Sequence, residues 1–314
     1  MKELAIATYG LTKRFDGYIA VNEIDLEVKA GEVYGLIGPN GAGKTTLIKM
    51  LATAEKPTKG EIYLHGTPLL RNDTNSRLKQ RIGYLPDDFP LYDDLTVWDY
   101  LDYFARLYLL KQPQRDRRIY EVLELVQLEN KRQSIISTLS RGMKQRLSLA
   151  RTIIHEPVLL LLDEPVSGLD PVARQQFREI IKVLQSAGMT ILISSHVLSD
   201  LAELCTSVGI MELGFLIESA ELSQLYQRLS RQQITLATLG KMELLQQKLS
   251  QNSLVTNWER IDRNTLKLDF DGGEADRAKL LRSLILEDIP LAEFHHSQED
   301  LESIFLQLGH QQTS

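Results

Sequence analysis

The stretch Gly38-Pro-Asn-Gly-Ala-Gly-Lys44-Thr45-Thr46 decides the fold of this chain. It follows the short apolar run Val33–Ile37 and leads into residues 47–51, whose sequence is typical of a helix. A Gly-rich loop with this spacing, placed between a strand and a helix, predicts a phosphate-binding loop. Its glycines expose successive backbone N–H groups, and the helix dipole favours an anion at the loop. The alternative is a Gly-rich turn with a surface lysine, which the strand and helix on either side disfavour.

Residues of this loop have separate chemical tasks. Lys44 is expected to reach the β- and γ-phosphates, and the Thr45 hydroxyl is expected to be a ligand of Mg²⁺. The residues expected to bind the nucleotide here are Gly38, Pro39, Asn40, Gly41, Ala42, Gly43, Lys44, Thr45 and Thr46. The sequence therefore predicts a site for a nucleoside triphosphate, ATP, together with Mg²⁺.

The composition limits what else the chain can be. Its 314 residues are enough for two domains, and Lys+Arg 36 against Asp+Glu 42 give a formal net charge of −6. A nucleic-acid groove usually makes a domain basic, so this balance argues against a nucleic-acid partner. No apolar run approaches the roughly 18 residues that span a bilayer, and the N-terminus lacks the apolar core of a signal peptide. A single cysteine, Cys205, fits a reducing compartment, so we expect a cytoplasmic protein. Any membrane role would then come through a partner chain.

Two acidic residues follow a second apolar run, residues 157–162. An apolar run that ends in carboxylates indicates a buried parallel strand whose polar end lies at the ligand edge of the sheet. Asp163 is expected to hold Mg²⁺, and Glu164 is expected to orient or deprotonate the attacking water. Adjacent residues can take these separate roles because consecutive side chains at a strand end point in different directions.

Three further motifs surround this strand. LSRGMKQR (residues 139–146) comes before it, while SGLD (167–170) and SSH (194–196) come after it. Together with the phosphate loop and LLLLDEP (159–165), they stand in one order along the chain. Over residues 1 to about 220 the chain therefore resembles the nucleotide-binding subunits of ABC transporters.

The resemblance implies roles for residues outside the phosphate loop. In that family the LSGGQ-like motif contacts the γ-phosphate held by the other subunit, which assigns Ser140 and Gly142 to the nucleotide. It makes His196 a hydrogen-bonding partner of the γ-phosphate that also helps to hold the water. Asp170 would belong to the loop that crosses the dimer interface. Ser140 and Asp170 also fit ordinary helix N-caps, and a lone histidine after a strand is often structural.

Two positions invite alternative interpretations. Phe15 falls where the family stacks an aromatic ring on adenine, and Tyr18 is a nearby alternative. Asp87 stands where the family usually has a glutamine that approaches Mg²⁺ and water. A carboxylate can bind the cation, since Mg²⁺ prefers hard anionic oxygens, but it cannot donate a hydrogen bond while ionised. We expect Asp87 to contact both the nucleotide and Mg²⁺.

The expected fold class is α/β, a P-loop NTPase of the ABC type followed by a small α+β domain. Residues 1–220 form the ATP-binding domain, with an aromatic-rich helical subdomain at about 87–138. Residues 221–314 form the accessory domain, whose order βαββαβ predicts a ferredoxin-like fold. A linking helix, these six elements and a closing helix are expected at 221–229, 233–238, 241–250, 254–259, 265–270, 274–286, 290–295 and 298–308.

The resemblance implies an ATPase that converts ATP and water to ADP and phosphate. It also implies a homodimer that sandwiches two ATP molecules and drives a separately encoded integral membrane permease. Residues 299–308 resemble the ending of ABC-2 type export ATPases, so the expected function is the ATPase subunit of an exporter at the cytoplasmic face of the cell membrane. The alternatives are an importer subunit, a soluble ABC-type ATPase acting on ribosomes or DNA, and a regulator that uses nucleotide only to dimerise.

Overall fold

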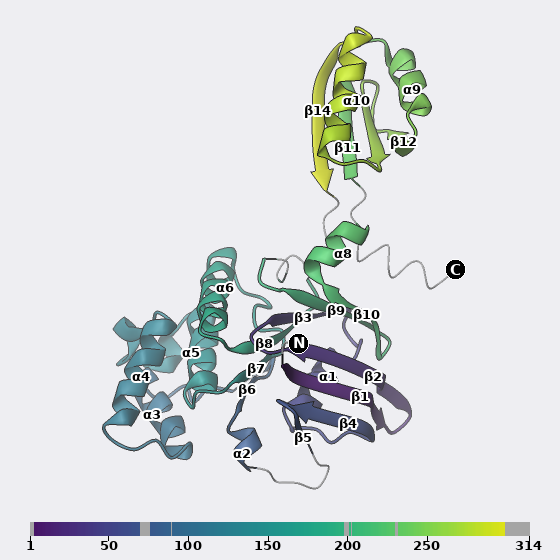
Figure 1. Cartoon of the computed structure of the whole chain (residues 1–314). Coiled ribbons are helices and arrows are strands. Elements are labelled where there is room, and N and C mark those ends of the chain that lie inside the picture. The colour runs from purple at the N-terminus through teal and green to yellow at the C-terminus, as the bar shows by residue number, and fades with distance from the viewer. Residues whose placement is uncertain are drawn as a thin grey trace. The chain divides into compact units, whose positions relative to one another are not determined.

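The computed structural model (Figure 1) describes residues 3–69, 76–88, 90–197, 201, 203–229 and 232–298. Contacts between elements divide the chain into two units, residues 1–222 and 223–314. A closing helix was expected at residues 298–308. Gln298 instead ends a strand, and residues 299–308 lie outside the described part of the chain. None of the helices in the described ranges combines the length and apolar character that crossing a bilayer requires.

The first unit is built on a six-stranded sheet of order β10-β9-β3-β8-β7-β6. Its strands are β3 (Val33–Ile37), β6 (Ile82–Leu85), β7 (Leu159–Leu162), β8 (Thr190–Ser195), β9 (Ser207–Glu212) and β10 (Phe215–Glu221). Neighbouring strands run parallel except for β10, which is antiparallel to β9. Strands β3, β7 and β8 are buried along their whole length, as parallel strands covered on both faces are.

The register of this sheet brings the motifs together. Strands β3 and β8 pair through Ile37 and Ser195, and Leu162 of β7 pairs with both β8 and β6. Because these strands are parallel, their carboxyl ends lie at the same edge of the sheet, where open α/β sheets bind ligands. The segments that follow β3, β6, β7 and β8 therefore meet at one edge, although they are far apart in the sequence.

A second, antiparallel sheet of order β2-β1-β4-β5 supports the phosphate loop. Its strands are β1 (Leu4–Phe15), β2 (Tyr18–Lys29), β4 (Lys59–Leu64) and β5 (Thr67–Pro68). Buried apolar side chains of β1, β2 and β4 belong to one core cluster with those of the helix α1 (Lys44–Leu51) and of β3. Both ends of the loop between β3 and α1 are thus anchored in this core.

The remaining helices of the first unit are α2 (Ser76–Lys79), α3 (Val97–Leu107), α4 (Gln114–Leu125), α5 (Arg141–Ile153) and α6 (Pro171–Ser186), with short 3₁₀ turns at Glu129–Lys131 and Ile136–Thr138. Of these helices, α3 to α6 lie together in Figure 1, whereas α2 lies apart from them. The helices α3, α4 and α5 contact one another, and α5 also contacts α6. Tyr100 and Leu101 of α3 are fully buried, whereas Tyr92 is 50% and Tyr103 45% exposed. The aromatic-rich segment therefore supplies both a helical core and surface tyrosines, among them Tyr92 and Tyr103.

The second unit has the element order βαββαβ. A helix, α8 (Leu222–Leu229), leads into β11 (Gln232–Thr238), α9 (Met242–Gln251), β12 (Val255–Arg260), β13 (Thr265–Phe270), α10 (Glu274–Leu286) and β14 (Leu291–Gln298). The sheet is antiparallel with the order β12-β13-β11-β14, the strand order of a ferredoxin-like fold. Apolar side chains of α9 and α10 pack on those of the sheet in a separate core cluster. The last strand is longer than expected, because its pairing with β11 continues from Leu291 to Gln298.

Candidate functional site

The phosphate loop lies between β3 and α1, and close packing explains its glycines. Gly43 precedes α1 with a φ of 101°, a left-handed conformation that glycine tolerates best. A Cβ atom added to Gly43 would lie 2.2 Å from the Ala20 carbonyl oxygen, and one added to Gly38 would lie 2.2 Å from the Met211 carbonyl oxygen. The loop is therefore fixed against β2 and β9. Lys44 is 5% exposed, and its Nζ donates to the carbonyl oxygen of Gly38 at 2.6 Å.

A cavity of about 230 Å³ opens in front of this loop. It is lined by Tyr18, Ala20, Asn40, Gly41, Ala42, Gly43, Lys44, Thr45, Thr46, Asp87 and Glu164. The cavity thus joins the phosphate loop to an acidic residue after β6 and another after β7. Gly38 and Pro39 do not line the cavity, and their carbonyl oxygens accept hydrogen bonds from Lys44.

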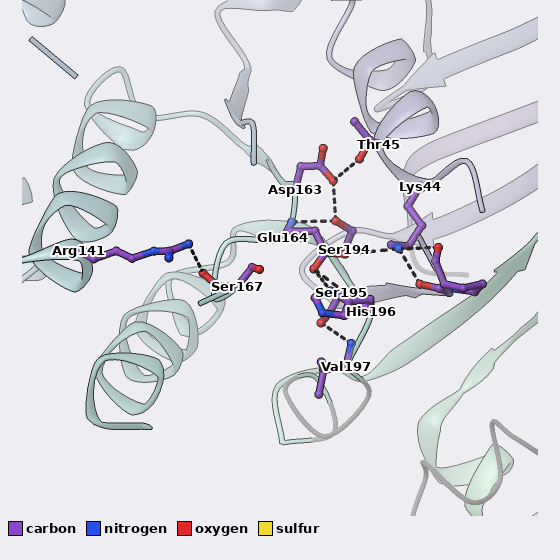
Figure 2. A network of polar contacts seen from close by, with 12 residues as sticks. Lys44, Thr45, Arg141, Asp163, Glu164, Ser167, Ser194, Ser195, His196 and Val197 are labelled. Carbon is purple, nitrogen blue, oxygen red and sulfur yellow. Dashed lines mark hydrogen bonds and ion pairs between the residues drawn. The ribbon is translucent and has the colours of Figure 1, made fainter. Parts of the chain in front are cut away.

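Asp163 lies at the centre of the polar network in Figure 2. Its Oδ1 accepts hydrogen bonds from Thr45 Oγ1 at 3.1 Å and from Ser194 Oγ at 2.8 Å. The side chain has no exposed surface, and burial raises the pKa of this carboxyl above its ordinary value. Among the described residues, Oδ2 is buried without a hydrogen-bond partner. A carboxylate oxygen of this kind beside a threonine hydroxyl fits a hard cation such as Mg²⁺.

Glu164 follows Asp163 in a left-handed conformation with a φ of 49°. Its backbone N–H donates to Ser194 Oγ at 2.9 Å, so the same serine orients both acidic residues. Its carboxylate Oε2 lies 2.8 Å from His196 Nδ1, and Oε1 lies 3.4 Å from Lys44 Nζ. The side chains of Lys44, Glu164 and His196 therefore form one chain of polar contacts at the edge of the cavity (Figure 2).

Asp87 faces the same cavity from the segment after β6. The charges of Asp163 and Asp87 act on Tyr84, whose hydroxyl is buried. Burial, with a smaller effect of these two carboxylates, raises the pKa of Tyr84 to about 12. The charges of Asp87 and Glu164 also act on Asp163, although in the described ranges no three acidic, histidine or cysteine residues are grouped closely enough to form a metal site by themselves.

The two helix starts named in the sequence lie apart from the lining of this cavity. Ser140 is the N-cap of α5 and accepts a hydrogen bond from the Met143 N–H at 3.3 Å. Asp170 is the N-cap of α6 and accepts one from the Ala173 N–H at 2.9 Å. The N-cap interpretation thus applies to both residues. Gly142 packs against α6, where an added Cβ would lie 2.7 Å from the Ala173 Cβ.

The two aromatic candidates for the adenine stack on each other. The ring centroids of Phe15 and Tyr18 are 5.5 Å apart, with an angle of 30° between the rings. Lys13 Nζ lies 4.7 Å from the centroid of the Phe15 ring. Tyr18 lines the cavity and is 61% exposed, whereas Phe15 does not line it. The aromatic surface nearest the phosphate loop therefore belongs to Tyr18.

Sequence reasoning missed the role of Ser194 in this site. Ser194 is the first residue of the SSH motif, but its contact with Asp163 depends on the strand register that places Leu162 opposite Ile193. One residue further along both strands, Ser194 comes within hydrogen-bonding distance of Asp163. Only the pairing of β7 with β8 makes this contact visible.

Comparison with known proteins agrees with this geometry. A family model described as ABC transporter matches residues 21–167. The bacitracin transport ATP-binding protein BcrA of Enterococcus faecalis is 34% identical over 309 residues, which are 98% of this chain and 96% of that protein. The linearmycin resistance ATP-binding protein LnrL of Bacillus subtilis is 32% identical over 306 residues, 95% of this chain and 96% of that protein.

A solved structure shows the same likeness. The protein cbiO1 from Clostridium perfringens, part of the ABC transporter complex cbiONQ, matches with a TM-score of 0.67 and 26% sequence identity over 72% of this chain and 92% of that one. The phosphate loop, the acidic strand end and the signature-like helix thus occur in a chain that is similar to BcrA and LnrL over nearly the whole length of those proteins. The chain belongs to the ATP-binding subunits of ABC transporters, which hydrolyse ATP to drive transport.

Proposed function

We propose that two copies of this chain bind two ATP molecules and Mg²⁺ between them and energise export through a separately encoded integral membrane permease. Such a complex places the chain at the cytoplasmic face of the cell membrane. The observation that carries the proposal is the position of Glu164, whose carboxylate contacts His196 and Lys44 at the edge of the phosphate-loop cavity. This is where a group that acts on the attacking water is needed.

The residues around the cavity have distinct proposed tasks. Lys44 and the backbone N–H groups of residues 40–46 hold the phosphates, and charge neutralisation of this kind is the main requirement of phosphoryl transfer. Thr45, Asp163 and Asp87 hold Mg²⁺, which neutralises phosphate charge when bound. Glu164 orients or deprotonates water, and His196 holds the Glu164 carboxylate and contacts the γ-phosphate. Tyr18 offers its aromatic surface to the adenine, and Phe15 supports it by stacking on the Tyr18 ring.

The dimer follows from the position of the signature residues. Ser140 and Gly142 lie at the start of α5, and neither lines the cavity of its own chain. An N-terminal helix end presents free N–H groups that suit a phosphate. A second copy can bring this helix start and Asp170 to the nucleotide, which supports a homodimer with two shared sites.

The proposed direction of transport is supported by relatives that match both units. The two whose names refer to bacitracin transport and linearmycin resistance are aligned over 98% and 95% of this chain. Removing a compound from the cell is the direction that produces resistance. Export is therefore favoured over import for this chain.

The dimer and the role of Glu164 can be tested together. We expect Glu164→Gln to bind ATP and lower turnover by a factor of ~10²–10⁴, the usual contribution of a general base. Because the Glu164→Gln variant would keep its ATP, light scattering of this variant in the presence of Mg²⁺ and ATP should show a dimer of two 35.7 kDa chains. Lys44→Ala is the matched control, because weakened phosphate binding should leave it monomeric. Near-normal turnover of Glu164→Gln would remove Glu164 from the role, and a monomer under all conditions would exclude the homodimer.

The permease is tested by purifying the tagged full chain from gently solubilised native membranes. The expected co-purifying protein is polytopic and lacks ATPase motifs of its own. Recovery with ribosomes or nucleic acid instead would support the soluble alternative and contradict the exporter proposal.

A further inference from the structure

Arg141 is an unexpected residue at the start of the signature helix. It is the first residue of α5, directly after the N-cap Ser140, and the first turn contains no acidic residue. A positive charge at a helix N-terminus is opposed by the helix dipole. Arg141 is exposed, and its guanidinium extends away from the helix start to contact another part of the chain.

The guanidinium is held by the SGLD loop, residues 167–170, as Figure 2 shows. Arg141 Nη2 donates to the carbonyl oxygen of Ser167 at 3.1 Å. Gly168 has a φ of +65°, and a Cβ added to it would lie 2.6 Å from Arg141 Cζ and from both terminal nitrogens. The planar group therefore lies directly against the α-carbon of Gly168, a contact that any larger residue there would obstruct.

The same loop is held from its other end and is connected to Glu164. Arg174 Nε, from α6, donates to the carbonyl oxygen of Leu169 at 3.0 Å. The Ser167 N–H donates to the carbonyl oxygen of Glu164 at 3.1 Å. Arg141 thus connects the start of α5 to the turn that carries Glu164 through a single short loop.

We propose that Arg141 is a positioning residue that fastens the SGLD loop to the start of α5. The start of α5 and the turn of Glu164 then move as one rigid piece when a second copy closes on the nucleotide. The closure part of this inference rests on the proposed function, whereas the fastening is a property of the single chain. Arg141 needs no contact with the nucleotide for this role.

The contact with Gly168 separates this role from a simple charge effect. A cation that acts on a phosphate of the partner's nucleotide could be a lysine as well as an arginine. Packing on Gly168 needs the planar guanidinium, which lysine lacks. The pair of variants Arg141→Lys and Arg141→Gly therefore distinguishes the two roles.

The test compares these variants with the wild-type chain and with Arg117→Gln. Arg117 is a matched control because it is an exposed arginine on α4 that pairs with Glu121 in its own helix. Amide hydrogen exchange of residues 164–170 is measured in the full chain without nucleotide. ATP turnover is then measured as separate kcat and KM values.

We expect Arg141→Gly to speed amide exchange in residues 164–170 by about tenfold or more, with little change elsewhere. Without the Arg141 contacts, less free energy is needed to open this loop locally. Its kcat should fall by about tenfold or more while KM changes little, since misplaced groups mainly affect the reacting geometry. Arg141→Lys should recover only part of both effects. Arg117→Gln should match the wild type in both measurements.

Three results would overturn the inference. The first is wild-type exchange of residues 164–170 in Arg141→Gly, and the second is increased exchange with wild-type kcat. The third is full recovery of kcat by Arg141→Lys with its exchange still increased, which would point to charge alone. A chain that fails to dimerise contradicts the proposed function, while the exchange measurement still decides whether Arg141 fastens the loop.

Discussion

Asp163 belongs to the polar network of the site, although its surroundings disfavour an ionised carboxylate. Its carboxyl group has no exposed surface, and it lies near the charges of Asp87 and Glu164. Burial disfavours the ionised form, and these neighbours add to that effect. Hydrogen bonds from Thr45 and Ser194 compensate on one oxygen only. The residue is therefore costly to keep charged in the metal-free chain and well suited to a cation.

This environment predicts how pH affects stability. Because burial raises the pKa of Asp163 above the ordinary 3.8, the folded chain binds this proton more tightly than the unfolded chain. The stability contributed by Asp163 is present below the ordinary pKa and is lost as pH rises through the raised one. In metal-free solution the free energy of unfolding of the wild type, relative to Asp163→Asn, should fall as pH increases over this window. Urea titrations of both proteins at several pH values measure this difference in the free energy of unfolding.

The control for this measurement is Asp288→Asn. Lys241 lowers the pKa of the exposed Asp288, so any small pH dependence from Asp288 should have the opposite sign, with stability lost as pH falls. Parallel pH curves for the wild type and Asp163→Asn would contradict the account given for Asp163.

We expect Asp87 to make nucleotide binding depend on the cation. Its carboxylate faces the cavity that is proposed to hold the phosphates, so without Mg²⁺ it repels them. We expect Asp87→Gln to bind Mg²⁺-free ATP about fivefold more tightly, since a partly exposed charge pair is worth about 1 kcal/mol. The gain in affinity on adding Mg²⁺ should shrink correspondingly. Titration with a fluorescent ATP analogue, with and without EDTA, measures both. Asp88→Gln, outside the cavity lining, should behave as the wild type, and an equal effect in both variants would rule out a specific role of Asp87.

At the scale of elements, the signature helix is defined by its packing against α6. The two helices meet where Gly142 faces Ala173, and both begin with a side-chain N-cap nearby. Glycine inside a helix is unfavourable by itself, by about 1 kcal/mol relative to alanine. Its presence here follows from the close approach of the helices.

The close approach of the two helices predicts that alanine at position 142 destabilises the chain, whereas helix propensity alone predicts that it stabilises the chain. We expect Gly142→Ala to lower the free energy of unfolding by about 1–3 kcal/mol, the usual cost of overpacking. Propensity alone would predict a gain. Denaturant titration of Gly142→Ala, Ala173→Gly and the double variant measures the coupling between the two positions. Gly240→Ala is the control, because its added Cβ would lie 3.9 Å from its nearest neighbour, an ordinary contact. A stabilised Gly142→Ala variant would show that the helices can separate freely.

At the scale of the whole molecule, the two units have separate cores. The buried cluster of the first unit draws on both of its sheets and α1, and that of the second on β11, β13, α9 and α10. A unit with its own hydrophobic core can fold alone. All residues that line the phosphate-loop cavity belong to the first unit.

This division predicts the behaviour of a shortened chain. We expect residues 1–230 to remain folded and to bind ATP with an affinity within about threefold of the full chain, because no core residue of the first unit is removed. Thermal unfolding and nucleotide titration test this. A chain that ends at Gly214 is the contrasting variant, since it lacks β10 and leaves the edge of β9 unpaired, so it should aggregate. Loss of ATP binding by residues 1–230 would show that the second unit is needed to complete the site.

Much of this organisation could be predicted because it depends on local patterns. The spacing of the glycines and Lys44, with a strand before them and a helix after them, was enough to predict the phosphate loop. The elements of the second unit followed from alternation and helical periodicity, and β13 and α10 lie at the expected residues. The extension of β14 to Gln298 was missed, because strand length depends on the partner strand rather than on local sequence.

The sequence by itself determined the family, the nucleotide chemistry and the candidate residues, because each motif is a short run whose chemistry depends on residue type and spacing. Only the tertiary structure decided how these runs meet. The parallel register of β7 and β8 placed Ser194 within reach of both Asp163 and Glu164. The antiparallel sheet put Tyr18 rather than Phe15 against the cavity, and the packing of α5 on α6 laid Arg141 on Gly168. Each of these contacts joins segments that are brought together by strand pairing or helix packing. Such pairing is governed by burial over the whole domain, so no local pattern reveals it.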